Sequence, residues 1–421
     1  MGDWKHAAKT LLFGSKLNVL LICIPVALIC AASDAGNGVI FFFALASICP
    51  LAERLGFITE QLAMYTNPTV GGLLNASFGN ATEVIVSIAG LRAGLLRVVQ
   101  LSLLGSVLSN MLLVLGCAFL AGGTRYKEQV FNVTGVGVNI TLLMLAVLAQ
   151  TLPAILTASH TGLKGSRSGL ALSRFTSFVM LSMYGAFLYF QLVSHKEIYD
   201  DDDDESDKAS DGPDGSELLE LPPAGRLSSG QDVEGGASAD KKAEEAKKAD
   251  DDDDELVFTF KGAIACLAAV TVLIAVLSEL LVSSIEGAAE AWDMPLPFIS
   301  VILLPIVGNA AEHASAVIFA LHNKMDLAIG IAVGSSTQIA LLVMPACVLL
   351  SAAMGKPLGL DLEPFETASL LLSVLMLAFT VVGGRANWLK GAALVAAYLV
   401  LGAAYVVHDD PLLTAEHQNS G

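Results

Sequence analysis

The chain has 421 residues, of which 54% are hydrophobic and only 15% are charged, and its mean hydropathy is +0.66. Soluble globular domains carry about 25% charged residues, so this composition argues against a soluble enzyme. The formal net charge of −18 also excludes a nucleic-acid partner, because such a surface must be basic.

Apolar runs long enough to cross a lipid bilayer recur along the whole chain. A membrane-spanning helix needs about 20 mostly apolar residues. The sequence therefore predicts an all-α polytopic membrane protein surrounded by lipid, with a short N-terminus at 1–16 and a C-terminal tail at 408–421. We expect about eleven transmembrane helices, near residues 17–33, 38–54, 69–91, 98–121, 133–153, 175–193, 258–284, 296–321, 327–353, 365–383 and 388–407.

One segment carries nearly all of the net negative charge. Residues 196–256 hold 23 Asp or Glu and 7 Lys or Arg, a net charge of −16. Such a segment cannot bury enough apolar surface to fold alone. The Lys and Arg residues of the short loops favour a cytosolic N-terminus, and this orientation makes 194–256 an acidic cytosolic linker. It is either a plain solvated connection or a low-affinity collector of divalent cations.

The two halves of the chain share a short motif. Residues 79–83 (GNATE) match 308–312 (GNAAE) at an offset of 229, and the Gly-Ser pair at 105–106 matches 334–335 at the same offset. Five predicted helices separate each motif from its match, and five is odd, so the matched helices must cross the membrane in opposite directions.

This arrangement predicts one N-terminal helix at 17–33 followed by two inverted five-helix repeats, at 38–193 and 257–407. Secondary transporters use the same plan. They bind substrate near the membrane midplane, on helices that glycine or proline interrupts.

Two carboxylates fall in the middle of apolar runs, Glu83 and Glu312. A charge at that depth is costly, so it indicates function. Asn80 precedes Glu83 by three residues and lies on the same helical face, and Asn309 precedes Glu312 in the same way. The predicted cation-binding oxygens belong to Asn80, Glu83, Ser106, Ser109, Asn309, Glu312, Ser335 and Gln338.

This set of oxygens suits a hard divalent cation such as Ca²⁺, although Mn²⁺ also accepts oxygen ligands. Two nearby desolvated carboxylates cannot both stay charged once the metal leaves, so Glu83 and Glu312 would then bind protons. Competition between metal and proton for one site is the basis of an antiporter. The cycle needs no ATP, and the sequence has no P-loop or aspartyl-phosphate motif. We expect a transporter and not an enzyme, without a cofactor, with Ca²⁺ as substrate and H⁺ as counter-ion.

Other polar residues in or near the spans have open roles. His313 follows Glu312 and is either a proton relay or a packed structural histidine. The remaining acidic residues lie at or near predicted span ends, where they form a hydrated access path or are simply solvated at the interface. These access-path candidates are Glu53, Glu60, Glu279, Glu286 and Glu290.

The motifs resemble the two signature repeats of the cation/proton exchangers, the vacuolar Ca²⁺/H⁺ antiporters within the calcium/cation antiporter superfamily. The resemblance lies in residues 79–87, 105–110, 308–320 and 334–343. It implies that Glu83 and Glu312 are the central Ca²⁺ and proton carboxylates and that the neighbouring polar residues line their site. It also implies alternating access in the membrane of a vacuole or another acidic organelle.

Three alternatives stay open at the level of sequence. The first is another exchanger, specific for Mn²⁺ or driven by Na⁺. The second belongs to a different class, a Ca²⁺-sensing channel or receptor that uses the acidic linker. The third is an intramembrane hydrolase, which the missing GxGD string disfavours. Assembly into a homo-oligomer is also left open.

Overall fold

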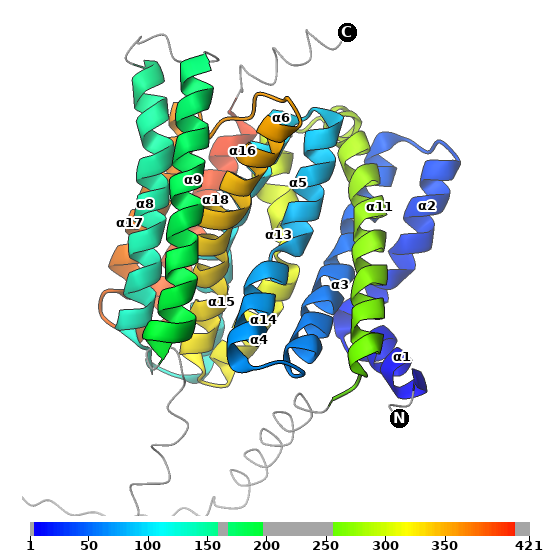
Figure 1. The fold of residues 1–421 in the computed structure, drawn as a ribbon, viewed down its shortest axis with the longest axis horizontal. Helices are drawn as coiled ribbons and strands as arrows, with labels where there is room; N and C mark the ends of the chain where they lie inside the picture. Colours follow the sequence, from blue (N-terminus) through cyan, green and yellow to red (C-terminus); the bar gives the residue numbers. More distant parts are fainter. Residues whose placement is uncertain (1–3, 159–166, 197–255, 409–421) are drawn as a thin grey trace, which may run out of the picture.

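Long helices make up almost all of the structure, a computed structural model that describes residues 4–158, 167–196 and 256–408. The helices pack side by side in a bundle (Figure 1). The first half comprises α1 (Trp4–Phe13), η1 (Lys16–Ile22), α2 (Cys23–Ala32), α3 (Asn37–Ala63), α4 (Pro68–Phe78), α5 (Ala81–Ala93), α6 (Leu96–Leu108), η2 (Ser109–Val114), α7 (Leu115–Arg125), β1 (Gln129–Val130), α8 (Val133–Ala158), α9 (Arg167–Tyr189) and η3 (Phe190–Ser194).

The second half repeats this pattern of long and interrupted helices. It comprises α11 (Phe260–Trp292), α12 (Leu296–Phe298), η6 (Ile299–Leu303), α13 (Leu304–Gly308), α14 (Ala310–Leu321), α15 (Met325–Gln338), η7 (Ile339–Val343), α16 (Met344–Ala353), α17 (Pro364–Val381), β2 (Arg385–Ala386) and α18 (Trp388–Val406). The two short strands pair antiparallel and join the loop after α7 to the loop before α18.

Eight helices within the described ranges are long and apolar enough to cross a membrane. A ninth span is broken, because Leu296–Gly308 and Ala310–Leu321 meet at an angle of 54°. The helical segment Lys16–Ala32 is shorter, and α4 with α5 does not meet the same criteria. Every predicted span coincides with one of these segments, so the polytopic all-α class is confirmed, while the count of eleven stays a prediction.

The matched helices of the two halves run in opposite directions. Figure 1 shows α4 and α5 rising from the end of the bundle near α1, whereas α13 and α14 descend towards that end. The predicted inverted arrangement is therefore confirmed. The described residues that flank the acidic segment, at the ends of η3 and α11, also lie at the α1 end (Figure 1). The acidic linker itself lies outside the described residues.

Several predicted boundaries were wrong. The span expected at 69–91 is two helices separated at Gly79 and Asn80. The span expected at 38–54 continues to Ala63, and the span expected at 258–284 continues to Trp292. Glu53, Glu279 and Glu286 therefore lie inside long helices, whereas Glu60 and Glu290 lie in the last turn of α3 and of α11, near the ends as predicted. The reason is that polar and charged residues continue a helix wherever it faces protein or water.

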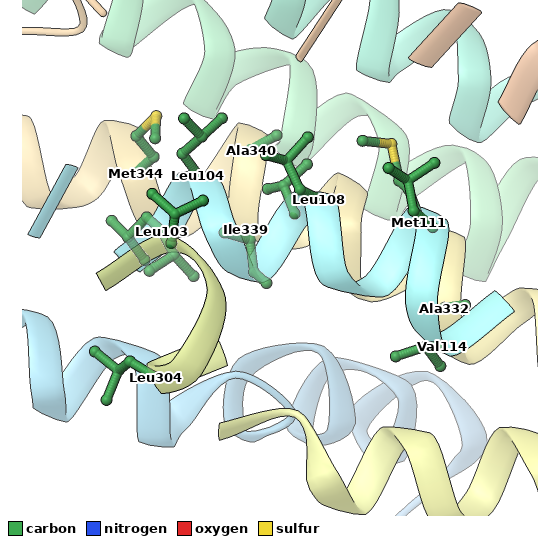
Figure 2. Close-up of a cluster of buried hydrophobic side chains, with 14 of the residues drawn as sticks. Leu103, Leu104, Leu108, Met111, Val114, Leu304, Ala332, Ile339, Ala340 and Met344 are labelled. Atoms are coloured by element: carbon green, nitrogen blue, oxygen red, sulfur yellow. The ribbon is translucent and has the colours of Figure 1, made fainter. Parts of the chain in front are cut away.

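The apolar core forms where the middle helices of the two repeats cross. Figure 2 shows leucines of α6 packed against Ile339, Ala340 and Met344 of the η7–α16 region, with Leu304 of α13 close by. These side chains are buried almost completely. Because lipid is as apolar as leucine, close van der Waals packing and not the hydrophobic effect stabilises such a contact in a membrane.

Candidate functional site

The site begins at two matched helix breaks. Asn80 separates α4 from α5 with φ −111° and ψ 27°, and Asn309 separates α13 from α14 with φ −90° and ψ 19°. Both backbones lie near the bridge region, outside the helical minimum. Each break places a glutamate, Glu83 or Glu312, at the third position of a new helix. The free N–H groups and the positive end of the helix dipole favour negative charge there.

A cavity of about 1690 Å³ leads from the α1 end of the bundle to both glutamates. Glu83, Glu312, Ser335 and Gln338 line it together. A smaller cavity of about 30 Å³ adjoins Glu83 and is lined also by Ser106. The two predicted carboxylates, Ser335 and Gln338 therefore meet around one cavity, although 229 residues separate the two motifs, and Ser106 lines the small cavity beside Glu83.

The carboxyl group of Glu83 reaches the helix break of the opposite repeat. A Cβ atom on Gly308 would lie 3.8 Å from Glu83 Oε1. A side chain at this position would therefore touch the carboxylate, and glycine keeps the space beside it clear. The same property exposes the backbone of the α13–α14 break to the cavity, where Gly308 is a lining residue.

The two asparagines are held by the opposite repeat. Asn80 Nδ2 donates a hydrogen bond of 2.6 Å to Gln338 Oε1, and Asn309 Nδ2 donates one of 3.2 Å to the Ser106 carbonyl. Both side chains are buried. Within the described chain, Asn80 Oδ1, Asn309 Oδ1 and Glu312 Oε2 are buried and accept no hydrogen bond. Buried polar atoms normally have partners, so these oxygens fit a site that coordinates a cation.

Four of the predicted site residues, Asn80, Asn309, Ser109 and His313, line neither of the two cavities. Ser109 is fully buried and does not line either of them. His313 is half-buried, and its Nδ1 lies 3.0 Å from the Asn309 carbonyl of its own helix. Neither cavity wall includes His313. The geometry therefore gives no support to the relay role for His313, which stays a prediction.

Two π-helical segments adjoin the site, and sequence reasoning did not predict them. The segment η2 begins at Ser109, and η7 begins directly after Gln338. They occupy matched positions in the two repeats. Such π-bulges widen a helix by one residue per turn and occur frequently at functional sites. No residue type in these apolar stretches distinguishes a π-helix from an α-helix, so the sequence offered no signal.

The open end of the large cavity is acidic. Of the access-path candidates, Glu53 and Glu60 line it, whereas Glu279, Glu286 and Glu290 do not. The structure adds Asp326, which lies in the first turn of α15 and accepts a hydrogen bond of 2.6 Å from the Asn132 amide. Together with Glu83 and Glu312 these make five acidic lining residues, against the two basic ones described there, Lys16 and Arg54.

The three access-path candidates that do not line the cavity all lie on α11, in the second repeat. Glu279 lies on α11 and forms an exposed ion pair of 3.3 Å with Arg92 at the end of α5. Glu279 is also the repeat counterpart of Glu53. The inverted repeats therefore place one glutamate on each side of the central site, Glu53 and Glu279, and only Glu53 lines the open cavity.

Each half-helix that carries a central glutamate is anchored at its far end by the other repeat. Lys356 Nζ donates to the Arg92 carbonyl at 2.9 Å and also to the Leu91 carbonyl, which caps α5. Arg125 Nη1 donates at 3.0 Å to the Leu321 carbonyl, which caps α14. Cations at helix C-termini complement the helix dipole, so both glutamate-bearing helices are fixed in matching ways.

Among the described residues no group of three or more His, Cys, Asp or Glu side chains is placed to hold a metal ion. A cation at this site would therefore combine the two carboxylates with neutral oxygens of amide, hydroxyl and backbone groups. Hard cations accept such mixed oxygen sets, whereas softer metals prefer thiolates or several imidazoles. Two carboxylates also balance the charge of one divalent ion or of two protons.

Comparisons with known proteins agree with this geometry. The family model described as "Sodium/calcium exchanger protein" matches residues 36–193 and 262–406. The chain is 45% identical to vacuolar cation/proton exchanger 3 of Oryza sativa subsp. japonica over 96% of this chain and 89% of the relative. It is 44% identical to vacuolar cation/proton exchanger 2 of Arabidopsis thaliana over 96% of this chain and 84% of the relative.

The fold also matches solved structures. Native YfkE superposes with a TM-score of 0.70 at 32% identity, covering 93% of this chain and all of YfkE. The H⁺/Ca²⁺ exchanger CAX superposes with a TM-score of 0.59 at 15% identity, covering 96% and 94% of the two chains, and this likeness supports the fold alone. The inverted motifs, the broken helices and these matches together establish that the chain belongs to the sodium/calcium exchanger protein family, as a member of its cation/proton exchangers.

Proposed function

We propose that this protein is a secondary antiporter that exchanges Ca²⁺ for H⁺ at the site formed by Glu83 and Glu312. The observation that carries the proposal is the meeting of these two carboxylates in one cavity. Each lies at the start of a half-helix, and the two helices run in opposite directions. Relatives named vacuolar cation/proton exchangers and the Ca²⁺/H⁺ antiporter protein YfkE support the choice of ions.

Coupling follows from the shared site. When a divalent cation leaves, two carboxylates in a site of low polarity repel each other, and protons then neutralise them. The cation cannot return until the protons leave. Each ion therefore excludes the other, and the cycle needs only the two gradients. The carboxylate-rich mouth would concentrate cations at the cavity by its electric field.

Alternating access is supported by a difference between two matched glycines. Gly105 on α6 lies against the Val301 carbonyl and the ring of Pro305, so that a Cβ there would clash. Its counterpart is Gly334 on α15. A Cβ atom on Gly334 would have no atom of another element within 4 Å. The tight contact lies on the closed side, and the open position on α15 directly precedes Ser335, which lines the cavity. A transporter built from inverted repeats would exchange the two contacts during its cycle.

The proposed sidedness combines the open cavity with the loop charges. The cavity opens at the end that carries α1 and the residues flanking the acidic segment. The Lys and Arg residues of the short loops favour the cytosol for that end. We therefore infer a conformation open to the cytosol, in a vacuolar or other acidic-organelle membrane, that takes up cytosolic Ca²⁺ in exchange for luminal protons.

Purified protein in liposomes with an imposed pH gradient tests this function. The experiment follows proton release with a pH-sensitive dye as Ca²⁺, Mn²⁺ or Na⁺ is added outside. We expect Ca²⁺ to release protons from acid-loaded liposomes, and we expect the signal to vanish when an ionophore collapses the gradient. Addition of Na⁺ alone should release none.

The alternatives give different results in the same assay. A response to Mn²⁺ but not Ca²⁺ would replace the proposed substrate, and uptake driven by a Na⁺ gradient would replace the counter-ion. Cation flux that persists without any proton movement would indicate a channel and overturn the antiport mechanism.

A further inference from the structure

A buried guanidinium group lies at the mouth of the large cavity. Arg54, on α3, lines the cavity, yet its side chain is only 8% exposed. Arginine remains charged in proteins, and a buried charge requires partners. Arg54 Nη2 lies 2.9 Å from Glu53 Oε1, and Nη1 donates at 3.2 Å to the Thr10 carbonyl of α1. The guanidinium carbon also lies 5.2 Å from the ring centre of Phe57.

The guanidinium of Arg54 contacts only one oxygen of its partner carboxylate. Glu53 Oε1 pairs with Arg54, whereas Glu53 Oε2 is buried and accepts no hydrogen bond within the described chain. Glu53 lines the same cavity as Glu312. A cation that moves along the cavity to the central site therefore passes Glu53, whose carboxylate already pairs with the guanidinium of Arg54.

The opposite half of the bundle has a corresponding pair. Glu279, the counterpart of Glu53, pairs with Arg92. The two arginines occupy unrelated positions in sequence, because Arg54 is next to its glutamate whereas Arg92 comes from another helix. The position that matches Arg54 is Leu280. Each of the two matched glutamates therefore pairs with an arginine, although the two arginines do not occupy matched positions in the repeats.

We propose that Arg54 is a positioning residue that limits how strongly Glu53 holds a cation in transit; this rests on the proposed exchange function. A carboxylate near the mouth attracts divalent cations, but a second strong site would trap them before they reach Glu83 and Glu312. Transport requires binding that is favourable enough for the ion to arrive and weak enough for it to leave. The guanidinium, held by the Thr10 carbonyl, supplies the opposing charge at a fixed position.

The test compares four proteins in liposomes: the unaltered chain, Arg54→Gln, Glu53→Gln and the double variant. The readouts are KM for Ca²⁺ and maximal rate of Ca²⁺-dependent proton release. We expect Arg54→Gln to lower KM by about threefold to tenfold and to lower the maximal rate, because an unopposed Glu53 retains the cation. Glu53→Gln should raise KM by a similar factor, because Arg54 then repels the cation.

The double variant separates this role from a structural one. Removal of both charges should return KM to within about twofold of the unaltered value, because the two electrostatic effects oppose each other. If Arg54 only held α1 in place, both single variants would impair transport in the same direction and the double variant would be no better. That result, or a raised KM for Arg54→Gln, overturns the proposal.

One further variant completes the test. Arg385→Gln removes an exposed charge that pairs with Glu128 near the same end of the bundle but does not line the cavity, so KM should stay within about twofold. If Arg54→Gln does not fold, the test rests on Glu53→Gln alone. A KM for Ca²⁺ that is unchanged or lower in Glu53→Gln would then contradict the proposal. Failure of the proposed exchange function would look different, because none of the proteins would couple Ca²⁺ to protons.

Discussion

The side-chain amide of Asn80 donates a 2.6 Å hydrogen bond to Gln338 Oε1, across 258 residues of sequence. This bond joins the helix break of the first repeat to the middle helix of the second. It engages one of the two lone pairs of Gln338 Oε1 and leaves Asn80 Oδ1 without a partner among the described residues. Gln338 therefore orients the asparagine in this conformation, and its role as a cation ligand stays a prediction.

Removal of that acceptor should weaken cation binding without unfolding the protein. Gln338→Leu frees the Asn80 amide to rotate, and loss of an outer partner of a metal ligand typically costs about tenfold to 100-fold in affinity. We expect KM for Ca²⁺ to rise by about tenfold in liposomes. Thr337→Val is the matched control, because the neighbouring Thr337 hydroxyl donates only to the Val333 carbonyl of its own helix. An equal rise in both variants would contradict the assigned role.

Neutralising either central carboxylate should abolish exchange. Glu83→Gln or Glu312→Gln keeps the size of the side chain but removes one of the two negative charges that balance a divalent cation. We expect less than about 1% of the unaltered rate of Ca²⁺-dependent proton release, with an unchanged elution profile from size-exclusion chromatography. Glu128→Gln, at an exposed glutamate paired with Arg385, should transport normally. Full activity of either central variant would remove the basis of the proposed site.

Protons on the side of the open cavity should compete with Ca²⁺. Both ions neutralise Glu83 and Glu312, so acidification of that side lowers the fraction of sites that can accept the cation. We expect KM for Ca²⁺ to rise steadily as the pH on that side falls, while the maximal rate at saturating Ca²⁺ stays constant. Initial rates over a grid of pH and Ca²⁺ concentrations test this. A falling maximal rate at constant KM would mean that protons and cation use separate sites.

The two matched glycines should respond differently to the same substitution. Gly105→Ala introduces a methyl group against the backbone of Val301, and such overpacking typically costs about 1–3 kcal/mol. We expect a lower thermal unfolding temperature in detergent for this variant. Gly334→Ala meets open space in this conformation and should leave the unfolding temperature unchanged.

Transport gives the second readout for the glycine pair. If α4 closes on α15 in the opposite state, Gly334→Ala should slow turnover although the protein is stable. Normal turnover of Gly334→Ala would mean that these two helices do not approach each other during the cycle.

A buried ion pair braces the closed end of the bundle. Arg97 on α6 and Glu366 on α17 are almost fully buried and bind each other directly, and Glu366 also caps its own helix through the Glu363 amide at 3.0 Å. Arg97→Met removes the guanidinium and should cost about 3–5 kcal/mol, because a buried carboxylate loses its counter-charge. Thermal unfolding in detergent measures the loss. Adding Glu366→Gln, which can still accept from the Glu363 amide, should restore most of the stability. Failure to recover would locate the cost in packing and not in charge.

The sequence alone determined the class of protein, its inverted repeats and the two central glutamates. Apolar run length dictates membrane helices whatever their packing, and an odd number of spans between GNATE and GNAAE forces opposite directions. Charges at mid-membrane depth are so costly that Glu83 and Glu312 were identifiable before any contact was known.

The tertiary structure decided which of the other polar residues share the site. Periodicity cannot tell that Gln338 binds Asn80, that Ser109 lies away from both cavities, or that Asp326 and Arg54 line the mouth, because these relationships join residues from different helices. It also decided which side is open. The inverted repeats share their central motifs, and Glu53 and Glu279 occupy matched positions in them. Only the packing of α13 against α6 closes one path while the other stays open.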